Sequence, residues 1–156
     1  MHHCVLYTAK TYKPFDRSTL AHILSVARIR NEMSGLTGVL LYGKCIVMQY
    51  LEGPQVEVEK TLERIRHDAR VHDVRIEVSR TITSRLFPNW SMAYDHAHDG
   101  DAPADTTDLR SADALPSPDG HFSLTLTMLR NFRDGVALGG VRPLGHARLA
   151  AEHTAP

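Results

Sequence analysis

Two apolar segments follow one another near the middle of the chain, at 36–42 and 45–51, with Gly43 and Lys44 between them. Both segments are hydrophobic at nearly every position, which is typical of strands that are covered on both faces of a sheet. A two-residue connection that contains glycine predicts a β-hairpin. The chain must therefore supply further elements to cover both sides of the sheet that contains this hairpin.

The remainder of the first 96 residues alternates between the strand period of two residues and the helical period of 3.6 residues. We expect a strand at 3–9 and a helix from about Ser18 to Gly35. A second helix follows Pro54, and two further strands are expected at 74–82 and 90–94. The order βαββαββ predicts an α+β fold. The economical packing is a ferredoxin-like, five-stranded mixed sheet with two helices on one face.

The composition changes after Tyr94. Residues 97–120 are rich in Asp, Ala, Pro, Ser and Thr, which predicts a polar linker, either without regular structure or with one short helix. Residues 121–134 regain helical spacing, and we expect this helix to cover the other face of the sheet. Residues 135–156 are expected to be a flexible tail. We therefore expect one domain at 1–96 and no second domain after it.

Composition and charge narrow the class of protein. With 156 residues, one domain can bury roughly two-thirds of its unfolded surface. The 18 basic and 18 acidic side chains balance, so bulk charge favours neither nucleic acid nor an anionic membrane as a partner. Cys4 and Cys45 lie in apolar segments and are expected to be buried free thiols. No signal peptide and no segment of about 20 apolar residues is found, so we expect a soluble, cytoplasmic protein.

Gln49 is the most unusual residue of the second apolar segment. A carboxamide is costly to bury unless its N–H and C=O groups find partners, so either the protein or a polar ligand must supply them. Asn31 lies at helical spacing on the apolar face of the first helix. Tyr7 shares a strand face with Val5. Taken alone, Asn31 could be a helix-end residue that caps backbone groups, and Tyr7 could be a core tyrosine with a satisfied hydroxyl group.

These residues occur in a sequence that resembles the BLUF family, the blue-light sensors using flavin. The resemblance covers about residues 2–96 and rests on five ordered pieces. They are Val5-Leu-Tyr7, Ala27-Arg-Ile-Arg-Asn31, Ser34-Gly-Leu-Thr-Gly-Val-Leu-Leu-Tyr42, Gln49-Tyr-Leu-Glu-Gly53 and Arg85-Leu-Phe-Pro-Asn-Trp-Ser-Met92. The spacings between Tyr7, Asn31, Gln49 and Trp90 fit the family without a gap.

The resemblance implies a flavin, taken to be FAD, whose ring lies between the two helices and the sheet. It implies that Asn31 binds the pyrimidine edge of the ring and that Arg70 reaches the C2 carbonyl side. Ile23 would pack on the ring, and Gln49 would lie between Tyr7 and the N5 and C4 carbonyl edge. Tyr7 would donate an electron and a proton after excitation, and rearrangement of the Gln49 amide would then change the hydrogen bonds to the ring.

The resemblance also implies a route for the signal. Because Trp90 and Met92 are two residues apart on the expected last strand, we expect both side chains to lie on the same face of that strand. An exchange of one for the other near the flavin would pass the change to the helix at 121–134. The output would be a partner protein or a change in self-association, and we expect a homo-oligomer. No catalytic activity is implied, because the flavin acts as a chromophore.

The sequence departs from the family pattern at three places. Cys45 stands where the family usually has glycine, and Gly43 is then expected to take over the turn. Val47 stands where phenylalanine is usual. The family's Asp-Pro-Arg-His reads Asp68-Ala-Arg-Val71 here, but Arg70 is retained. Changes at Cys45 and Val47 would alter packing near the ring and so the rate of dark recovery.

Two other hypotheses for the function remain open. A small metal-binding enzyme is one, because His96, His98 and Asp99 have the chemistry of metal ligands, although exposed histidines in a polar linker are the commoner explanation. A flavin-free protein-interaction module is the other. It would have little use for three buried polar side chains at Tyr7, Asn31 and Gln49.

Overall fold

The computed structural model describes residues 1–96 and 123–134 of the protein. The expected linker at 97–120, the first two residues of the expected last helix and the tail at 135–156 lie outside the described residues. In chain order the elements are β1 (His2–Thr11), α1 (Arg17–Ser34), β2 (Thr37–Gly43), β3 (Ile46–Gly53), α2 (Gln55–Arg66), β4 (Val71–Ile82), β5 (Ala93–His96) and α3 (Ser123–Arg133). The α+β fold and the βαββαββ order are confirmed.

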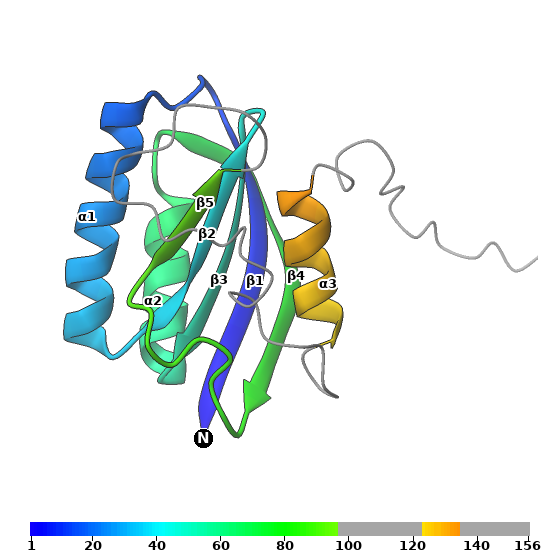
Figure 1. Ribbon diagram of the computed structural model, residues 1–156. Helices are drawn as coiled ribbons and strands as arrows, with labels where there is room; N and C mark the ends of the chain where they lie inside the picture. The colour runs from blue at the N-terminus through cyan, green and yellow to red at the C-terminus, as the bar shows by residue number, and fades with distance from the viewer. Residues whose placement is uncertain (97–122, 135–156) are drawn as a thin grey trace, which may run out of the picture.

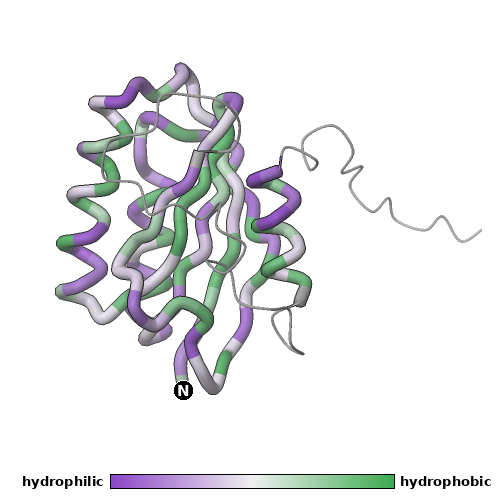
Figure 2. Tube along the Cα trace, in the orientation of Figure 1, coloured by the Kyte–Doolittle hydropathy of each residue, from purple (hydrophilic) through white to green (hydrophobic). Residues whose placement is uncertain are grey.

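The five strands form one mixed sheet in the order β4-β1-β3-β2-β5. Four strands pair antiparallel, and the short β5 pairs parallel with β2. Helices α1 and α2 cover one face of the sheet, and α3 lies against the other (Figure 1). The central strands carry long hydrophobic stretches (Figure 2), as expected for strands covered on both sides. Strand β3 is therefore the middle of the sheet, with β1 and β2 as its neighbours.

Local signals explain where the first helix begins and ends. The side chain of Asp16 accepts a hydrogen bond of 2.7 Å from the backbone N–H of Thr19, which caps the first turn of α1. Gly35 follows the helix with φ of 64°, a left-handed conformation that glycine adopts without steric cost. The helix consequently ends where β2 must begin, and Asn31 is left in its last turn on the side facing the sheet.

The turn of the central hairpin differs from the sequence prediction. Gly43 belongs to β2 and pairs with Ile46, so the two connecting residues are Lys44 and Cys45. Their φ values are 50° and 61°, as in a type I′ turn. The expectation that Gly43 takes over the turn is therefore wrong, because the strand pairing continues one residue further than the apolar pattern indicated. Cys45 occupies a left-handed position that favours glycine.

The core has two parts, one on each face of the sheet. The cluster under α1 and α2 includes Tyr7, Leu40 and Met92. The cluster under α3 includes Leu126, Leu129 and Phe132, all fully buried, packed with residues of β1, β2 and β3 such as Leu6, Leu41 and Tyr50. The apolar face of α3 thus covers the side of the sheet that α1 and α2 leave open. None of the helices at 1–96 or 123–134 is long and apolar enough to cross a membrane.

Candidate functional site

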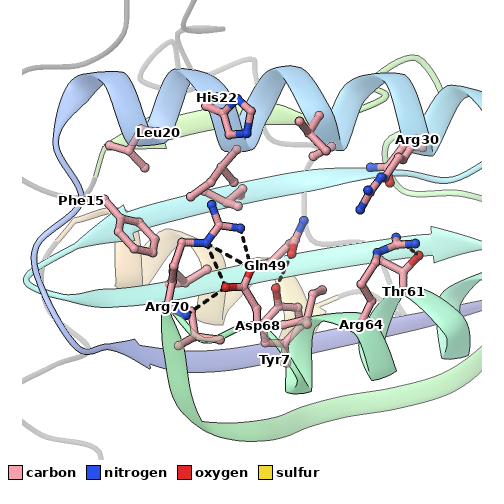
Figure 3. A pocket seen from close by; sticks show the side chains of 18 residues that line it. Tyr7, Phe15, Leu20, His22, Arg30, Gln49, Thr61, Arg64, Asp68 and Arg70 are labelled. Atoms are coloured by element: carbon pink, nitrogen blue, oxygen red, sulfur yellow. Dashed lines mark hydrogen bonds and ion pairs between the residues drawn. The ribbon is translucent and has the colours of Figure 1, made fainter.

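A cavity lies between α1, α2 and the face of the sheet that they cover (Figure 3). Tyr7, Ile23, Asn31, Gln49 and Arg70, which were selected from the sequence, all line it. Its volume is about 170 Å³, and it is partly open to solvent. A cavity of roughly 150 Å³ holds a single benzene ring. This space can therefore enclose part of a fused aromatic system whose remainder projects through the open side.

Gln49 lies on the central strand at the base of the cavity and is 5% exposed. It is the Cα partner of Tyr7 on β1 and of Leu40 on β2. The Tyr7 hydroxyl group donates to Gln49 Oε1 in a short hydrogen bond. Gln49 Nε2 donates to the sulfur of Met92 at 3.3 Å. The buried carboxamide therefore has a partner at each end, a strong donor on one side and a weak sulfur acceptor on the other.

Tyr7 is 2% exposed. Burial raises the pKa of Tyr7 well above its ordinary value of 10.0, and the charge of Asp68 raises it further. The phenol is therefore protonated in the folded protein at neutral pH. Its proton lies in the hydrogen bond to Gln49, so loss of an electron from the ring would leave a strongly acidic O–H group beside a carbonyl acceptor.

Asn31 projects from the last turn of α1 and is 2% exposed. Its Nδ2 donates to the backbone carbonyl of Ser91 at 2.6 Å. Among the described residues, no donor reaches its carboxamide oxygen, and the side chain lines the cavity. One end of this amide thus holds the chain before β5, while the other remains an acceptor for a ligand N–H group. Helical spacing had predicted the correct face for Asn31.

Arg70 lies at one end of the cavity, between α2 and β4, and forms an ion pair with Asp68 (Figure 3). Arg70 Nη2 is 2.5 Å from Asp68 Oδ2, and Nε is 2.9 Å from Oδ1. Hydrogen bonding from Arg70 lowers the pKa of Asp68, and the same contact raises the pKa of Arg70. The guanidinium group is therefore held in place at the cavity and retains N–H groups for an acceptor on a ligand.

Several cavity residues were not selected from the sequence. Arg30 on α1 and Arg64 on α2 lie together at the end opposite Arg70 (Figure 3), where Arg64 Nη2 donates to Thr61 at 3.0 Å. His22 lines the wall formed by α1. Thr61 follows Val58 and precedes Ile65 at helical spacing, so its position on the cavity side could have been predicted. The positions of Arg30 and Arg64 at the cavity could not have been predicted in this way, because exposed arginines do not follow the apolar spacing of a helix.

The prediction that Trp90 and Met92 share one face of a strand is wrong. Strand β5 begins at Ala93, so both residues precede it. Met92 is buried in the cluster under α1 and α2, whereas Trp90 packs on the cluster under α3, with its ring stacked on Phe87 at 5.3 Å. The reason is that the backbone before β5 is irregular: the Trp90 carbonyl accepts from Gly38 N–H at 2.9 Å before regular pairing begins.

The hypothesis of a small metal-binding enzyme receives no support from the described residues. No group of three His, Cys, Asp or Glu side chains comes together within 1–96 and 123–134. His98 and Asp99 lie outside those residues.

The donors and acceptors of the cavity fit the ring of a flavin. Apolar side chains such as Ile23 and Val47 supply contact for a flat ring. The carboxamide oxygen of Asn31 is an acceptor for a ring N–H group, and the guanidinium group of Arg70 is a donor for a ring carbonyl group. Gln49 adds an amide at the base whose two ends have opposite hydrogen-bond polarity. A buried ring with several polar atoms requires such a set of partners.

Two solved structures of similar fold are described in a photo-activated or a dark state. The protein matches the photo-activated state of BlsA at 30% identity and a TM-score of 0.59, covering 63% of this chain and 71% of that chain. It matches the dark state of BlrB, a BLUF protein, at 27% identity and a TM-score of 0.59, covering 62% and 73%. BlrP1 of Klebsiella pneumoniae, solved with FMN and cyclic diGMP, has a TM-score of 0.70 at 20% identity, which shows the shared fold alone.

Among named relatives, the alpha subunit of photoactivated adenylate cyclase from Euglena gracilis is 37% identical over 81 residues, 52% of this chain and 8% of that protein. A beta-like subunit from the same organism is 31% identical over 87 residues, 55% of this chain and 10% of that protein. The chain thus matches about a tenth of the length of these relatives. The model of one family, BLUF, sensors of blue-light using FAD, matches residues 2–93. With that match over more than half of its length, the chain belongs to the BLUF family.

Proposed function

We propose that the protein is a blue-light photoreceptor that binds FAD non-covalently in the cavity between α1, α2 and the sheet. The observation that carries this proposal is the buried hydrogen bond between Tyr7 and Gln49 at the base of that cavity. A phenol that is protonated, desolvated and bonded to an amide carbonyl is well suited to lose an electron and a proton together. The surrounding apolar contacts keep water from competing for that proton.

When bound, the flavin supplies a strong one-electron oxidant after it absorbs blue light. Tyr7 is the donor of the electron, and its phenolic proton leaves along the hydrogen bond to Gln49 Oε1. Return of the electron and the proton restores Tyr7. Rotation or tautomerisation of the Gln49 amide during this cycle would reverse its hydrogen-bond polarity. An N–H group would then replace a carbonyl group on one side, and the stronger donor at the ring would produce a small red shift.

The cations beside the cavity favour a flavin nucleotide over riboflavin, and the choice of FAD among flavin nucleotides rests on the family match. Arg30 and Arg64 lie at one end, and Arg70 with its partner Asp68 lies at the other. Arginine binds phosphate groups well because its planar N–H donors match phosphate oxygens. The phosphates of a flavin nucleotide that leave the open side of the cavity would meet Arg30 and Arg64. Riboflavin, which has no phosphate, should therefore bind more weakly than FAD.

The proposed output passes from Met92 to α3. Met92 contacts Gln49 directly, and Trp90, two residues earlier, packs on the cluster that α3 covers. A change in the Gln49 amide would alter its contact with the Met92 sulfur and shift the chain before β5. We propose that the resulting change at α3 is read by a partner protein or by self-association of a cytoplasmic homo-oligomer. The protein itself is proposed to act as a sensor without catalytic activity.

The test is a visible absorption spectrum of the FAD-loaded protein in darkness and after blue light. We expect a flavin spectrum that shifts to the red and relaxes in darkness. Gln49→Leu should bind FAD and lose the shift. Gln55→Leu is its matched control, because Gln55 is exposed on α2 and its side chain, among the described residues, is hydrogen-bonded to Glu59 at 2.8 Å. An unchanged shift in Gln49→Leu would refute the role of the amide.

The same measurement separates the flavin-free alternative. A protein purified without colour that also fails to take up added FAD would favour an interaction module. Bound flavin without a light-induced shift would mean that the cavity holds the cofactor but that the Tyr7–Gln49 pair does not switch. Binding of riboflavin as tight as that of FAD would remove the proposed role of Arg30 and Arg64.

A further inference from the structure

Glu52, near the end of β3, carries a carboxylate group that is fully buried. It lies on the same side of the strand as Tyr50, the side covered by α3. Four donors reach its two oxygens. Oε2 accepts from the backbone N–H of Leu86 at 2.7 Å and from the Tyr50 hydroxyl group at 3.1 Å. Oε1 accepts from the backbone N–H of Phe87 at 2.6 Å and from the Thr37 hydroxyl group at 3.3 Å.

No cationic side chain of the described residues forms an ion pair with Glu52. Arg85 approaches only through Thr37, whose hydroxyl group accepts from Arg85 Nη1 at 2.9 Å. A buried carboxylate without an ion pair is costly unless hydrogen bonds satisfy it, and here the two shortest bonds come from consecutive backbone N–H groups. The carboxylate therefore fixes the backbone at Leu86 and Phe87 to the central strand of the sheet.

Those two residues belong to the segment 85–92, which we call the relay segment. Its first part is held by Glu52. Its last part is held from the cavity side, where Ser91 accepts from Asn31 at 2.6 Å and Met92 accepts from Gln49 at 3.3 Å. Between these ends, Phe87 and Trp90 stack on each other and pack on the cluster under α3. The relay segment thus contacts both faces of the sheet and is fixed at both ends.

We propose that Glu52 is a positioning residue of the photoswitch, which anchors the start of the relay segment so that a change at Gln49 is passed to α3. This inference rests on the proposed function. With Leu86 and Phe87 fixed, a displacement of Met92 must be taken up between residues 88 and 92, where it turns the Trp90 ring against its neighbours. Without the anchor, the backbone of 85–88 absorbs the displacement and α3 is not affected.

The experiment uses the full chain loaded with FAD and the variant Glu52→Gln. The amide keeps the shape of the side chain but replaces one acceptor oxygen with an N–H₂ group, which then opposes a backbone N–H donor. We expect FAD binding and the red shift to be retained. We expect dark recovery to be about fivefold faster, because the variant loses one hydrogen bond to a carboxylate and the anchor is weaker. Light-induced change in hydrogen exchange of peptides from α3 should fall to roughly half or less.

Glu59→Gln is the matched control, because Glu59 is exposed on α2 and its side chain, within the described part of the chain, is hydrogen-bonded to Gln55. It should leave dark recovery and the response of α3 unchanged. If Glu52→Gln alters thermal stability alone, with recovery and the α3 response as in the wild type, the anchor plays no part in switching and the proposal is overturned. Wild-type protein without a red shift would refute the proposed function, and this inference would fall with it.

Thr37→Val provides a second test in case Glu52→Gln fails to fold or to bind FAD. It removes one of the four donors and the link to Arg85, and leaves both backbone contacts of Glu52 in place. We expect faster dark recovery by about twofold and a weaker response of α3. Recovery and α3 response equal to those of the wild type would overturn the proposal.

Discussion

The buried hydrogen bond between Tyr7 and Gln49 predicts that the two side chains are energetically coupled in darkness, before any light is absorbed. Tyr7→Phe removes the donor and leaves Gln49 Oε1 buried without it. Gln49→Leu removes the acceptor and leaves the phenolic O–H group buried. The double variant replaces both by apolar groups. Since Tyr7 is 2% and Gln49 5% exposed, water cannot readily replace the missing partner in either single variant.

The size of the effect follows from the cost of an unsatisfied buried group, about 1–3 kcal/mol in the free energy of unfolding. Each single variant should lose that amount. The double variant should lose less than the sum, by a coupling free energy of about 1–2 kcal/mol, because it leaves neither group unpaired. For a domain of this size, 1 kcal/mol corresponds to roughly 4 °C in Tm. Each single variant should therefore melt roughly 4–12 °C below the wild type.

The assay is thermal unfolding in darkness at one fixed FAD concentration. The Kd of each variant for FAD is measured by titration, so that the binding contribution, RT ln(1 + [FAD]/Kd), can be subtracted from each stability. Light-minus-dark absorption spectra of the same samples test the photoreaction. Tyr12→Phe is the control, because Tyr12 is 67% exposed and does not line the cavity. It should change neither property. Additive losses in the double variant would refute the coupling, and a reversible red shift in Tyr7→Phe would refute the role of the phenol.

Three further predictions follow from individual residues. Because burial raises the pKa of Tyr7 above its ordinary value of 10.0, the light response should not change between about pH 6 and 9. The neutral phenol also contributes to stability below pH 10, and this contribution is lost as the pH rises above 10, which alkaline unfolding measures. Cys45→Gly should raise the free energy of unfolding by about 0.5–1 kcal/mol in chemical denaturation because φ is 61°, whereas Cys45→Ala should not. Asn31→Ala should weaken FAD binding by about tenfold in a titration and also loosen Ser91, which shortens dark recovery.

The fold and the faces on which Tyr7 and Asn31 lie could be predicted from local patterns, whereas the grouping of these residues with Gln49 in one cavity was implied by the resemblance to the BLUF family. Alternation of side chains on β1 and helical spacing on α1 placed Tyr7 and Asn31 on surfaces that face each other. The apolar surroundings of Gln49 indicated a buried amide. These features are set by periods of two and 3.6 residues, and packing of two helices on a mixed sheet brings them together.

Features that depend on long-range contacts were not accessible in the same way. Trp90 and Met92 were assigned to a strand by their apolar character, yet the backbone there is held by bonds to Gly38 and Asn31, so alternation does not apply. The turn at Cys45 uses a left-handed conformation at a residue that does not favour it. The sequence around Glu52 does not indicate that its carboxylate is buried, because the backbone groups that bind it, at residues 86 and 87, lie more than 30 residues away along the chain.

The position of the relay segment explains why a signal from Gln49 would reach α3 in preference to α1 or α2. Gln49 lies in the middle of a sheet whose strands are joined by continuous hydrogen bonds, so a side chain there cannot pass from one face to the other. The change has to travel around an edge. At the β5 edge the pairing is short. Immediately before it, the chain contacts Gln49 through Met92 and the cluster under α3 through Trp90. The relay segment contacts both faces of the sheet, is anchored at its start and is followed by a short edge strand. Among the described residues, it is therefore the part best placed to carry that change.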